Sequence, residues 1–258
     1  VGGEIRLSSN GNLRDVSALS NITTVGSAHG SDSKDAHLYL SSNPKLGSLA
    51  GLESVTEIRG DLDINSCGTE AGYELTDLTA LDAVQTINGM LYVGGNDNLT
   101  TLFGASAQLA TINGNTSDVT FNIYNNDALV DLNGLEEVTV VETIIVQDND
   151  VLNDVTALNT IDDVNGDLTI ANSPSLAELP AMSSLQHITG KLDLDYNGSS
   201  GTPLTDLGFT ALESVQNLEL RWCHIDIDSG YASDADIEET WCNTWAVANT
   251  YISGNTYY

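Results

Sequence analysis

The sequence is poor in basic residues. Seven Lys and Arg stand against 37 Asp and Glu among 258 residues, which gives a formal net charge of -30. So few cations cannot form a basic patch, which excludes nucleic acid as a partner and opposes binding to an anionic membrane. The acidity fits a salty or calcium-containing exterior, where screening reduces self-repulsion, and it fits simple solubility equally well. Charge alone therefore leaves the partner open.

Long hydrophobic runs are also missing. No stretch approaches the roughly 18 apolar residues that a membrane-spanning helix needs, so no membrane insertion is expected. The first residues, Val1 to Leu7, lack a basic segment followed by a long apolar one, so we expect that any targeting peptide was removed or never included.

Cysteine, histidine and enzyme motifs are scarce. The four histidines, His29, His37, His187 and His224, show no metal-ligand spacing. The sequence has no Gly-rich phosphate loop followed by Lys, no H-E-x-x-H and no G-x-S-x-G element. We therefore predict no catalytic residues, no metal ligands and no cofactor from motifs.

What the chain does contain is an internal repeat. Residues 167–190 read DLTIANSPSLAELPAMSSLQHITG, and the framework L-x-I-x-x-N/S-x-x-L-x-x-L recurs along nearly the whole chain. Aligning the repeats places one equivalent residue in each turn: Asn10, Asn43, Cys67, Asn96, Asn126, Asn149, Ser173, Asn197 and Cys223. Their spacings of 23 to 33 residues lie within or close to the range of leucine-rich repeats. The repeat predicts about nine turns of a solenoid.

Each recurring position has a physical task. Apolar residues alternate with polar ones in the L-x-L segments, so these should be short strands of one parallel sheet with one face buried. The register predicts a single buried stack of Leu40, Ile64, Val93, Ile123, Val146, Ile170 and Leu194. An Asn amide at each turn can satisfy both a donor and an acceptor of the buried backbone, so the recurring Asn should form a ladder.

Four segments carry a more specific resemblance. They read IRGDLDI (58–64), INGMLYV (87–93), VNGDLTI (164–170) and ITGKLDL (188–194). These segments resemble receptor L-domains, a group that includes ligand-binding lobes of insulin-type and growth-factor receptors, fungal cell-wall glycoproteins and bacterial surface proteins. The resemblance covers roughly residues 3 to 223. It implies a mainly β, right-handed leucine-rich-repeat or L-domain-like solenoid that binds ligands while secreted or displayed at a cell surface.

The end of the chain departs from the repeat. Residues 233–249, SDADIEETWCNTWAVAN, begin with a plausible N-cap and place Ile237, Trp241 and Trp245 four residues apart. We predict a capping helix that covers the open end of the solenoid, with cofactor stacking as the alternative role of the tryptophans. The expected organisation is one solenoid domain over residues 1–258, with repeat turns at about 3–223 and a cap at about 224–258.

The three cysteines allow at most one disulfide. Cys223 in the last turn and Cys242 on the predicted helix are the expected pair. Six turns separate Cys67 from Cys223, which amounts to about 29 Å at the spacing of parallel strands. That distance far exceeds the separation a disulfide allows, so Cys67 should remain a free thiol.

Acid pairs keep two alternatives open. Pairs that share one side of a strand are Asp61 with Asp63, Asp193 with Asp195, and Asp226 with Asp228. Two carboxylates at glycosidase spacing would support the alternative function of a carbohydrate-active β-solenoid enzyme. Residues 226–238 also resemble a calcium loop, although Gly230 and Ile237 stand where an EF-hand needs Asp or Asn and Glu.

The outward side of the sheet is the expected working surface, because every turn contributes to it. Alternation predicts an outward row of Tyr39, Asp63, Tyr92, Asn122, Ile145, Thr169, Asp193 and Glu219. A neighbouring row should contain Ser41, Asn65, Tyr124, Gln147, Asp195 and Arg221.

From these rows we predict ligand contacts by Tyr39, Asp63, Tyr92, Asn122, Tyr124, Gln147, Thr169, Asp193, Asp195 and Arg221. The tyrosines offer amphipathic contact area and the acids can accept hydrogen bonds from sugar hydroxyls or peptide amines. The expected partner is a glycan or polypeptide on another cell or in the matrix. An ordinary solvated face is the alternative, with the inserted loops Ser27–Asp35 and Gly68–Glu74 as the other candidate site.

Overall fold

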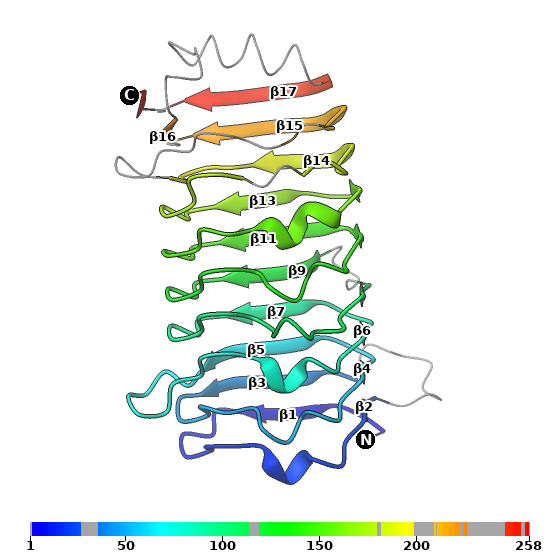
Figure 1. Ribbon diagram of the computed structural model, residues 1–258, viewed down its shortest axis with the longest axis vertical. Helices are drawn as coiled ribbons and strands as arrows, with labels where there is room; N and C mark the ends of the chain where they lie inside the picture. The colour runs from blue at the N-terminus through cyan, green and yellow to red at the C-terminus, as the bar shows by residue number, and fades with distance from the viewer. Residues whose placement is uncertain are drawn as a thin grey trace.

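A long parallel sheet dominates the computed structural model, which describes residues 2–26, 36–113, 119–179, 182–198, 209, 211–221, 224–225, 246–253 and 256–257. Figure 1 shows its strands stacked one above another along the long axis. They are β1 (Ile5–Ser8), β3 (Leu38–Asn43), β5 (Leu62–Cys67), β7 (Leu91–Gly94), β9 (Val119–Tyr124), β11 (Thr143–Gln147), β13 (Leu168–Ala171), β14 (His187–Asp193), β15 (Ser214–Arg221) and β17 (Ala246–Ser253). Each pairs in parallel with the next. The expected mainly β solenoid with a parallel sheet is confirmed.

The predicted buried stack is present. Leu40, Ile64 and Val93 are register partners on successive strands, and the register continues to Ile123 and later turns. All seven residues of the stack, Leu40, Ile64, Val93, Ile123, Val146, Ile170 and Leu194, are fully buried. The opposite side chains of the same strands must therefore point outward.

Short strands form a second row. Their bounds are β2 (Thr24–Val25), β4 (Glu57–Ile58), β6 (Thr86–Ile87), β8 (Thr111–Ile112), β10 (Val140–Val141) and β12 (Asp163–Val164). The first four form one sheet, whereas β10 and β12 continue through β14 into the main sheet. The row is thus interrupted between β8 and β10.

Single turns of 3-10 helix complete several repeats: η1 (Ser17–Leu19), η3 (Thr79–Leu81) and η4 (Thr156–Thr160). They lie in front of the main sheet in Figure 1. Within the described part of the chain, no helix has the length and apolar character to cross a membrane.

The asparagine ladder is also confirmed. The side-chain Oδ1 of Asn96 accepts a hydrogen bond from the backbone N–H of Cys67 at 2.9 Å, and its Nδ2 donates to the carbonyl of Ile64 at 3.0 Å. The backbone N–H of Asn96 donates in turn to Oδ1 of Asn126 at 3.2 Å. Each amide therefore links two strands at the point where the chain leaves the sheet.

The backbone before the ladder is left-handed, which explains why the amide is needed there. Positive φ angles of 51° to 60° occur at Ser9, Ser42, Ser66, Asn125, Asp148, Asn172 and Tyr196, each just before a ladder residue. At this turn the backbone N–H and C=O groups next to the ladder residue lose their partners in the neighbouring strand. The side-chain amide supplies hydrogen bonds to those groups instead.

The C-terminal segment corrects one prediction. Ala246 to Asn249, the last four residues of the predicted helix, begin strand β17, which pairs in parallel with β15. Val247, Thr250 and Ile252 are β-branched and favour a strand, and the open edge of β15 offers hydrogen bonds that override the helical spacing. The sheet thus continues past residue 223.

The other C-terminal predictions fall largely outside the described residues. Residues 233–245, Cys223, Cys242 and the calcium-loop-like segment 226–238 all lie there, so the helical cap and the count of nine turns are not confirmed. A short strand β16 (His224–Ile225) pairs in parallel with β18 (Thr256–Tyr257). Cys67 is a buried free thiol, as predicted.

Candidate functional site

The outward row lies in the predicted register. Tyr39 pairs with Asp63, Asp63 with Tyr92, and Tyr92 with Asn122. The row continues through Ile145, Thr169, Asp193 and Glu219. Because neighbouring strands lie about 4.8 Å apart, each residue of the row lies beside its register partners along one line. The structure also adds Arg6, the register partner of Tyr39, at the N-terminal end of this line.

A cation and two rings cluster at that N-terminal end. The guanidinium carbon of Arg6 lies 4.0 Å from the ring centroid of Tyr39, and the His37 ring stacks on Tyr39 at 4.8 Å. The Tyr39 hydroxyl donates to Oδ2 of Asp61 at 3.4 Å, and the same Asp61 oxygen lies 3.1 Å from Nδ1 of His37. Arg6 and His37 were not among the predicted site residues. A signal for Arg6 was present, because it precedes Asn10 by four residues, as Tyr39 precedes Asn43.

Asp63, on the next strand, has an unmet hydrogen-bonding group. Its Oδ1 is buried and has no hydrogen-bond partner. Burial, helped by repulsion from Asp61, raises the pKa of the Asp63 carboxyl to about 6, while the Arg6 guanidinium lowers it. The carboxylate is thus held partly away from water without a donor of its own.

Tyr92 and Tyr124 form an aromatic platform one strand further on. Their ring centroids lie 5.4 Å apart at an interplanar angle of 53°. Asn65 Nδ2 donates to the Tyr92 hydroxyl at 3.3 Å, and burial raises the pKa of Tyr92 well above its usual value. The platform depends on Gly94, since a Cβ atom there would collide with the Tyr124 ring.

Asn122 closes this part of the row with a second unmet acceptor. Its Oδ1 is buried and, like that of Asp63, has no hydrogen-bond partner. Asp63 and Asn122 flank Tyr92 on either side in the register. Two buried acceptors therefore stand on both sides of one aromatic ring.

The C-terminal part of the surface has a different character. Asp193 and Asp195 are only 8% and 4% exposed. Lys191 Nζ lies 2.6 Å from Oδ2 of Asp193, and the backbone N–H of Asp195 donates to Oδ1 of Asp193 at 3.1 Å. Gln147 and Thr169 are half-buried on the strands between the two parts, and the Arg221 side chain lies outside the described residues.

In each of the two described acid pairs, at least one carboxylate has structural partners. Asp61 Oδ1 accepts the backbone N–H of Met90 at 2.8 Å, and Asp193 is held by Lys191 and a backbone amide. Asp226 and Asp228 lie outside the described residues. No contact found in the described part of the chain favours the carbohydrate-active enzyme.

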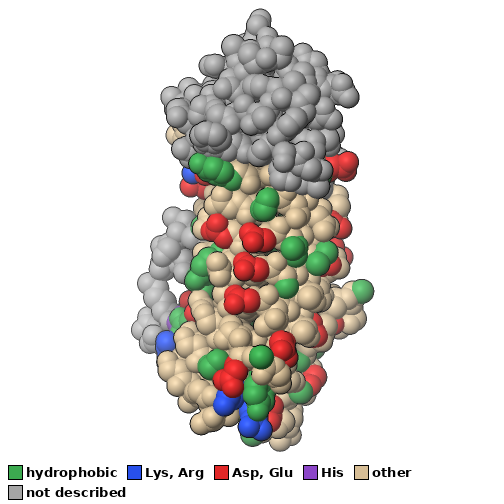
Figure 2. Space-filling model, turned by 90° about the vertical axis from the view of Figure 1, so that its left-hand side faces the viewer, with side chains coloured by type: hydrophobic (Ala, Val, Ile, Leu, Met, Phe, Trp, Pro, Cys, Tyr) green, Lys and Arg blue, Asp and Glu red, His purple; other side chains and the backbone are tan. Residues whose placement is uncertain are grey.

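Acidic side chains also gather on the side of the solenoid where the strands end. Figure 2 shows them in a column along the middle of that side. Asp97, Asp127 and Asp150 each follow a ladder asparagine, and burial together with the charges of Asp150 and Asp97 raises the pKa of Asp127. Among the residues described, no group of three or more His, Cys, Asp and Glu could hold a metal ion.

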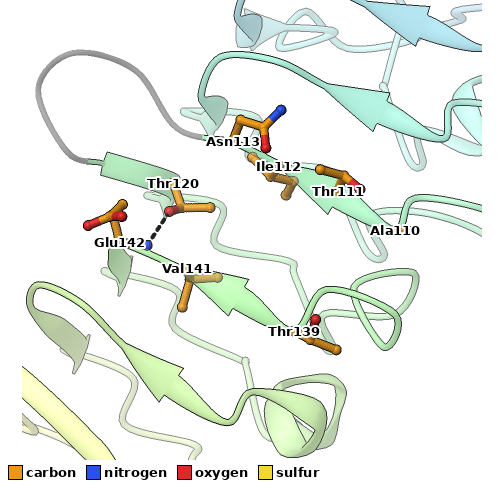
Figure 3. A pocket seen from close by; sticks show the side chains of 8 residues that line it. All are labelled: Ala110, Thr111, Ile112, Asn113, Thr120, Thr139, Val141 and Glu142. Carbon is orange, nitrogen blue, oxygen red and sulfur yellow. Dashed lines mark hydrogen bonds between the residues drawn. The ribbon is translucent and has the colours of Figure 1, made fainter.

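A cavity of about 380 Å³ marks the interruption between β8 and β10 (Figure 3). The residues that line it are Ala110, Thr111, Ile112, Asn113, Thr120, Thr139, Val141 and Glu142. The backbone N–H of Glu142 donates to Thr120 Oγ1 at 2.7 Å. Among the described residues that line this cavity, Glu142 is the one that is ionisable.

Comparison with known proteins adds one match. Residues 54–157 match the family model described as Receptor L domain, a ligand-binding module rather than an enzyme family. No curated protein and no solved structure matches the chain. The matched segment contains Asp63, Tyr92, Asn122 and Tyr124. The expected resemblance is therefore confirmed: over residues 54–157 the chain is similar to the Receptor L domain family, within a parallel β-solenoid.

Proposed function

We propose that this protein is a secreted or cell-surface binding module that recognises a glycan or polypeptide through the outward face of its main sheet. We further propose that the stretch from Tyr39 to Tyr124 is the centre of that surface. The expected partner lies on another cell or in the matrix, and the net charge of -30 opposes nucleic acid. The predicted ligand contacts that lie C-terminal to this stretch are Gln147, Thr169, Asp193, Asp195 and Arg221.

The observation that carries this proposal is the pair of unmet acceptors, Asp63 Oδ1 and Asn122 Oδ1, on either side of Tyr92. A buried polar atom without a partner costs a folded protein about 1–3 kcal/mol. Both oxygens are covered, so a ligand recovers that cost where the Asp63 or Asn122 side chain turns toward its donor. The match to a ligand-binding family over the same residues supports the assignment.

The tyrosines add contact area to this site. Tyr92 and Tyr124 present two rings in contact, held on a rigid sheet. Aromatic anchors of this kind lose little conformational entropy on binding and often dominate the energy of an interface. We therefore assign them the central role in affinity.

The test begins with glycan and peptide arrays, screened with and without calcium, to identify a ligand. The double variant Tyr92→Ala/Tyr124→Ala should then weaken binding at least tenfold, or about 1.4 kcal/mol, with a nearly unchanged melting temperature. Tyr196→Ala is the matched control, because Tyr196 is 48% exposed in the turn after β14. Unchanged affinity of the double variant, with loss in Tyr73→Ala, would move the site to the inserted loop at residues 68–74.

A further inference from the structure

One cationic side chain of the protein itself, Arg6, already binds an aromatic ring on the outward face. Arg6 lies over the Tyr39 ring at 4.0 Å and its charge lowers the pKa of Asp63, two strands away. Arg6 also forms an ion pair with Glu4. A guanidinium group on this face thus combines stacking on an aromatic ring with attraction by nearby carboxylates.

Two strands further on, the same surroundings recur without a cation. Within the described ranges, the aromatic rings over which a Lys or Arg lies are Tyr39 and Tyr73, not Tyr92. Asp63 and Asn122 flank Tyr92 and keep buried oxygens without a donor. The sequence contains no Lys or Arg between Arg59 and Lys191, so strands β5 to β13 carry none.

From this juxtaposition we infer that Asp63 and Tyr92 bind a guanidinium or ammonium group on a basic polypeptide partner. This inference rests on the proposed function and names its ligand class. The cation stacks on the Tyr92 ring and pairs with the carboxylate of Asp63 on the neighbouring strand.

Charge decides between the two ligand classes of the proposed function. A sugar hydroxyl can donate a hydrogen bond to Asp63, but it does not neutralise a carboxylate that burial has taken partly out of water. A cationic side chain does both. A chain with a net charge of -30 also attracts a basic polypeptide over longer distances.

The probe is an acetylated, amidated hexapeptide with alternating Arg and Thr, whose extended form points every Arg to one side. A second peptide with citrulline in place of each Arg keeps the shape and removes the charge. With the 258-residue chain at pH 7.5 and about 0.15 M salt, calorimetry should show at least tenfold tighter binding of the Arg peptide.

Paired variants then locate the effect. Asp63→Asn should weaken binding of the Arg peptide at least tenfold, whereas Asp127→Asn, which removes the same charge from the side where the strands end, should change it less than about threefold. Melting temperatures measured on both variants confirm that they are folded.

Three results would overturn the inference: no binding of the Arg peptide below about 1 mM, equal affinity for the citrulline peptide, or equal losses in Asp63→Asn and Asp127→Asn. A neutral array ligand that is lost in Tyr92→Ala/Tyr124→Ala but insensitive to Asp63→Asn would also overturn it, while leaving the proposed function intact. Binding that neither variant changes would contradict both.

Discussion

Asp63 and Asp193 occupy the same position of the repeat and the same outward row, yet their surroundings are opposite. Asp193 is buried with Lys191 2.6 Å away and a backbone amide as a second partner. Asp63 keeps one buried oxygen without any donor. The position in the repeat determines on which face a side chain lies. The residues at neighbouring positions determine whether that side chain is hydrogen-bonded within the protein or lacks a donor there.

The ladder differs between the same two regions. In the N-terminal part, the amides of Asn96, Asn126 and Asn149 each bond to the backbone of a neighbouring strand. At Ser173 the hydroxyl donates only locally, to the carbonyl of Ala171 at 3.4 Å. Asn197 in the following turn again donates to the carbonyl of Ile170, so it is at Ser173 that the ladder lacks a side-chain bond to the preceding strand.

The largest effect should come from breaking the N-terminal ladder. Asn126→Ala removes the acceptor of the Asn96 N–H and the donor to the carbonyls of Val93 and Tyr124. We expect a loss of about 3 kcal/mol in the free energy of unfolding, measured by urea denaturation, because buried backbone groups lose their partners. Ser173→Ala should cost less than about 1 kcal/mol. Equal losses would contradict the difference between Asn126 and Ser173.

Removing the lysine should make Asp193 resemble Asp63. Lys191→Met takes away the ammonium partner and leaves a buried carboxylate, so we expect a loss of about 1–2 kcal/mol in urea denaturation. Arg59→Met is the control and should cost less than about 0.5 kcal/mol, because the carboxylate that it leaves, Glu57, is 32% exposed against 12% for Asp193. Adding Asp193→Asn should restore part of the loss; a further loss would count against this explanation.

Asp63→Asn should have the opposite sign to the Lys191 variant. The pKa of Asp63 is raised to about 6 in the folded protein, so the folded state binds more protons than the unfolded state between pH 3.8 and 6. The contribution of Asp63 to stability is therefore present below that window and lost as pH rises through it. The variant should raise the melting temperature by on the order of 2 °C at pH 7.5 and leave it unchanged near pH 3.5. A lower melting temperature at pH 7.5 would show that the ionised carboxylate has a stabilising partner.

The smallest expected effect is on the reactivity of the cysteine thiols, Cys67 in the N-terminal half and Cys223 and Cys242 near the C-terminus. Burial raises the pKa of the Cys67 thiol to about 11, so a thiol reagent at pH 8 should leave it unmodified in the folded protein. Under denaturing, non-reducing conditions one thiol should react if Cys223 and Cys242 form the proposed disulfide. Three reactive thiols would remove that bond and weaken the extracellular assignment.

The sequence was sufficient to predict the buried stack, the outward row and the ladder. Alternation with a period of two fixes the register, so Leu40, Tyr39 and Asn43 take defined sides of their strand. It could not distinguish Asp63 from Asp193, because their partners come from neighbouring positions. One signal was present: Lys191 lies two residues before Asp193, on the same side of the strand, whereas no cation has that place beside Asp63.

The remaining differences depend on tertiary contacts. The stacking of Arg6 and His37 on Tyr39 joins residues from two strands, and the unmet oxygens become visible only with the packing around them. The segment from Ala246 to Asn249 likewise took its structure from the available edge of β15 rather than from its own spacing.

Hydroxyl-radical footprinting of the tyrosines with the Arg peptide bound tests the central claim most directly, because it reports which surface becomes covered. We predict that oxidation of Tyr92 and Tyr124 falls at least threefold at saturating peptide, while Tyr73 and Tyr196, which lie away from the outward row, keep their rates. Protection of Tyr73 or Tyr196 with unchanged Tyr92 and Tyr124 would contradict the assignment of the binding site to the sheet face.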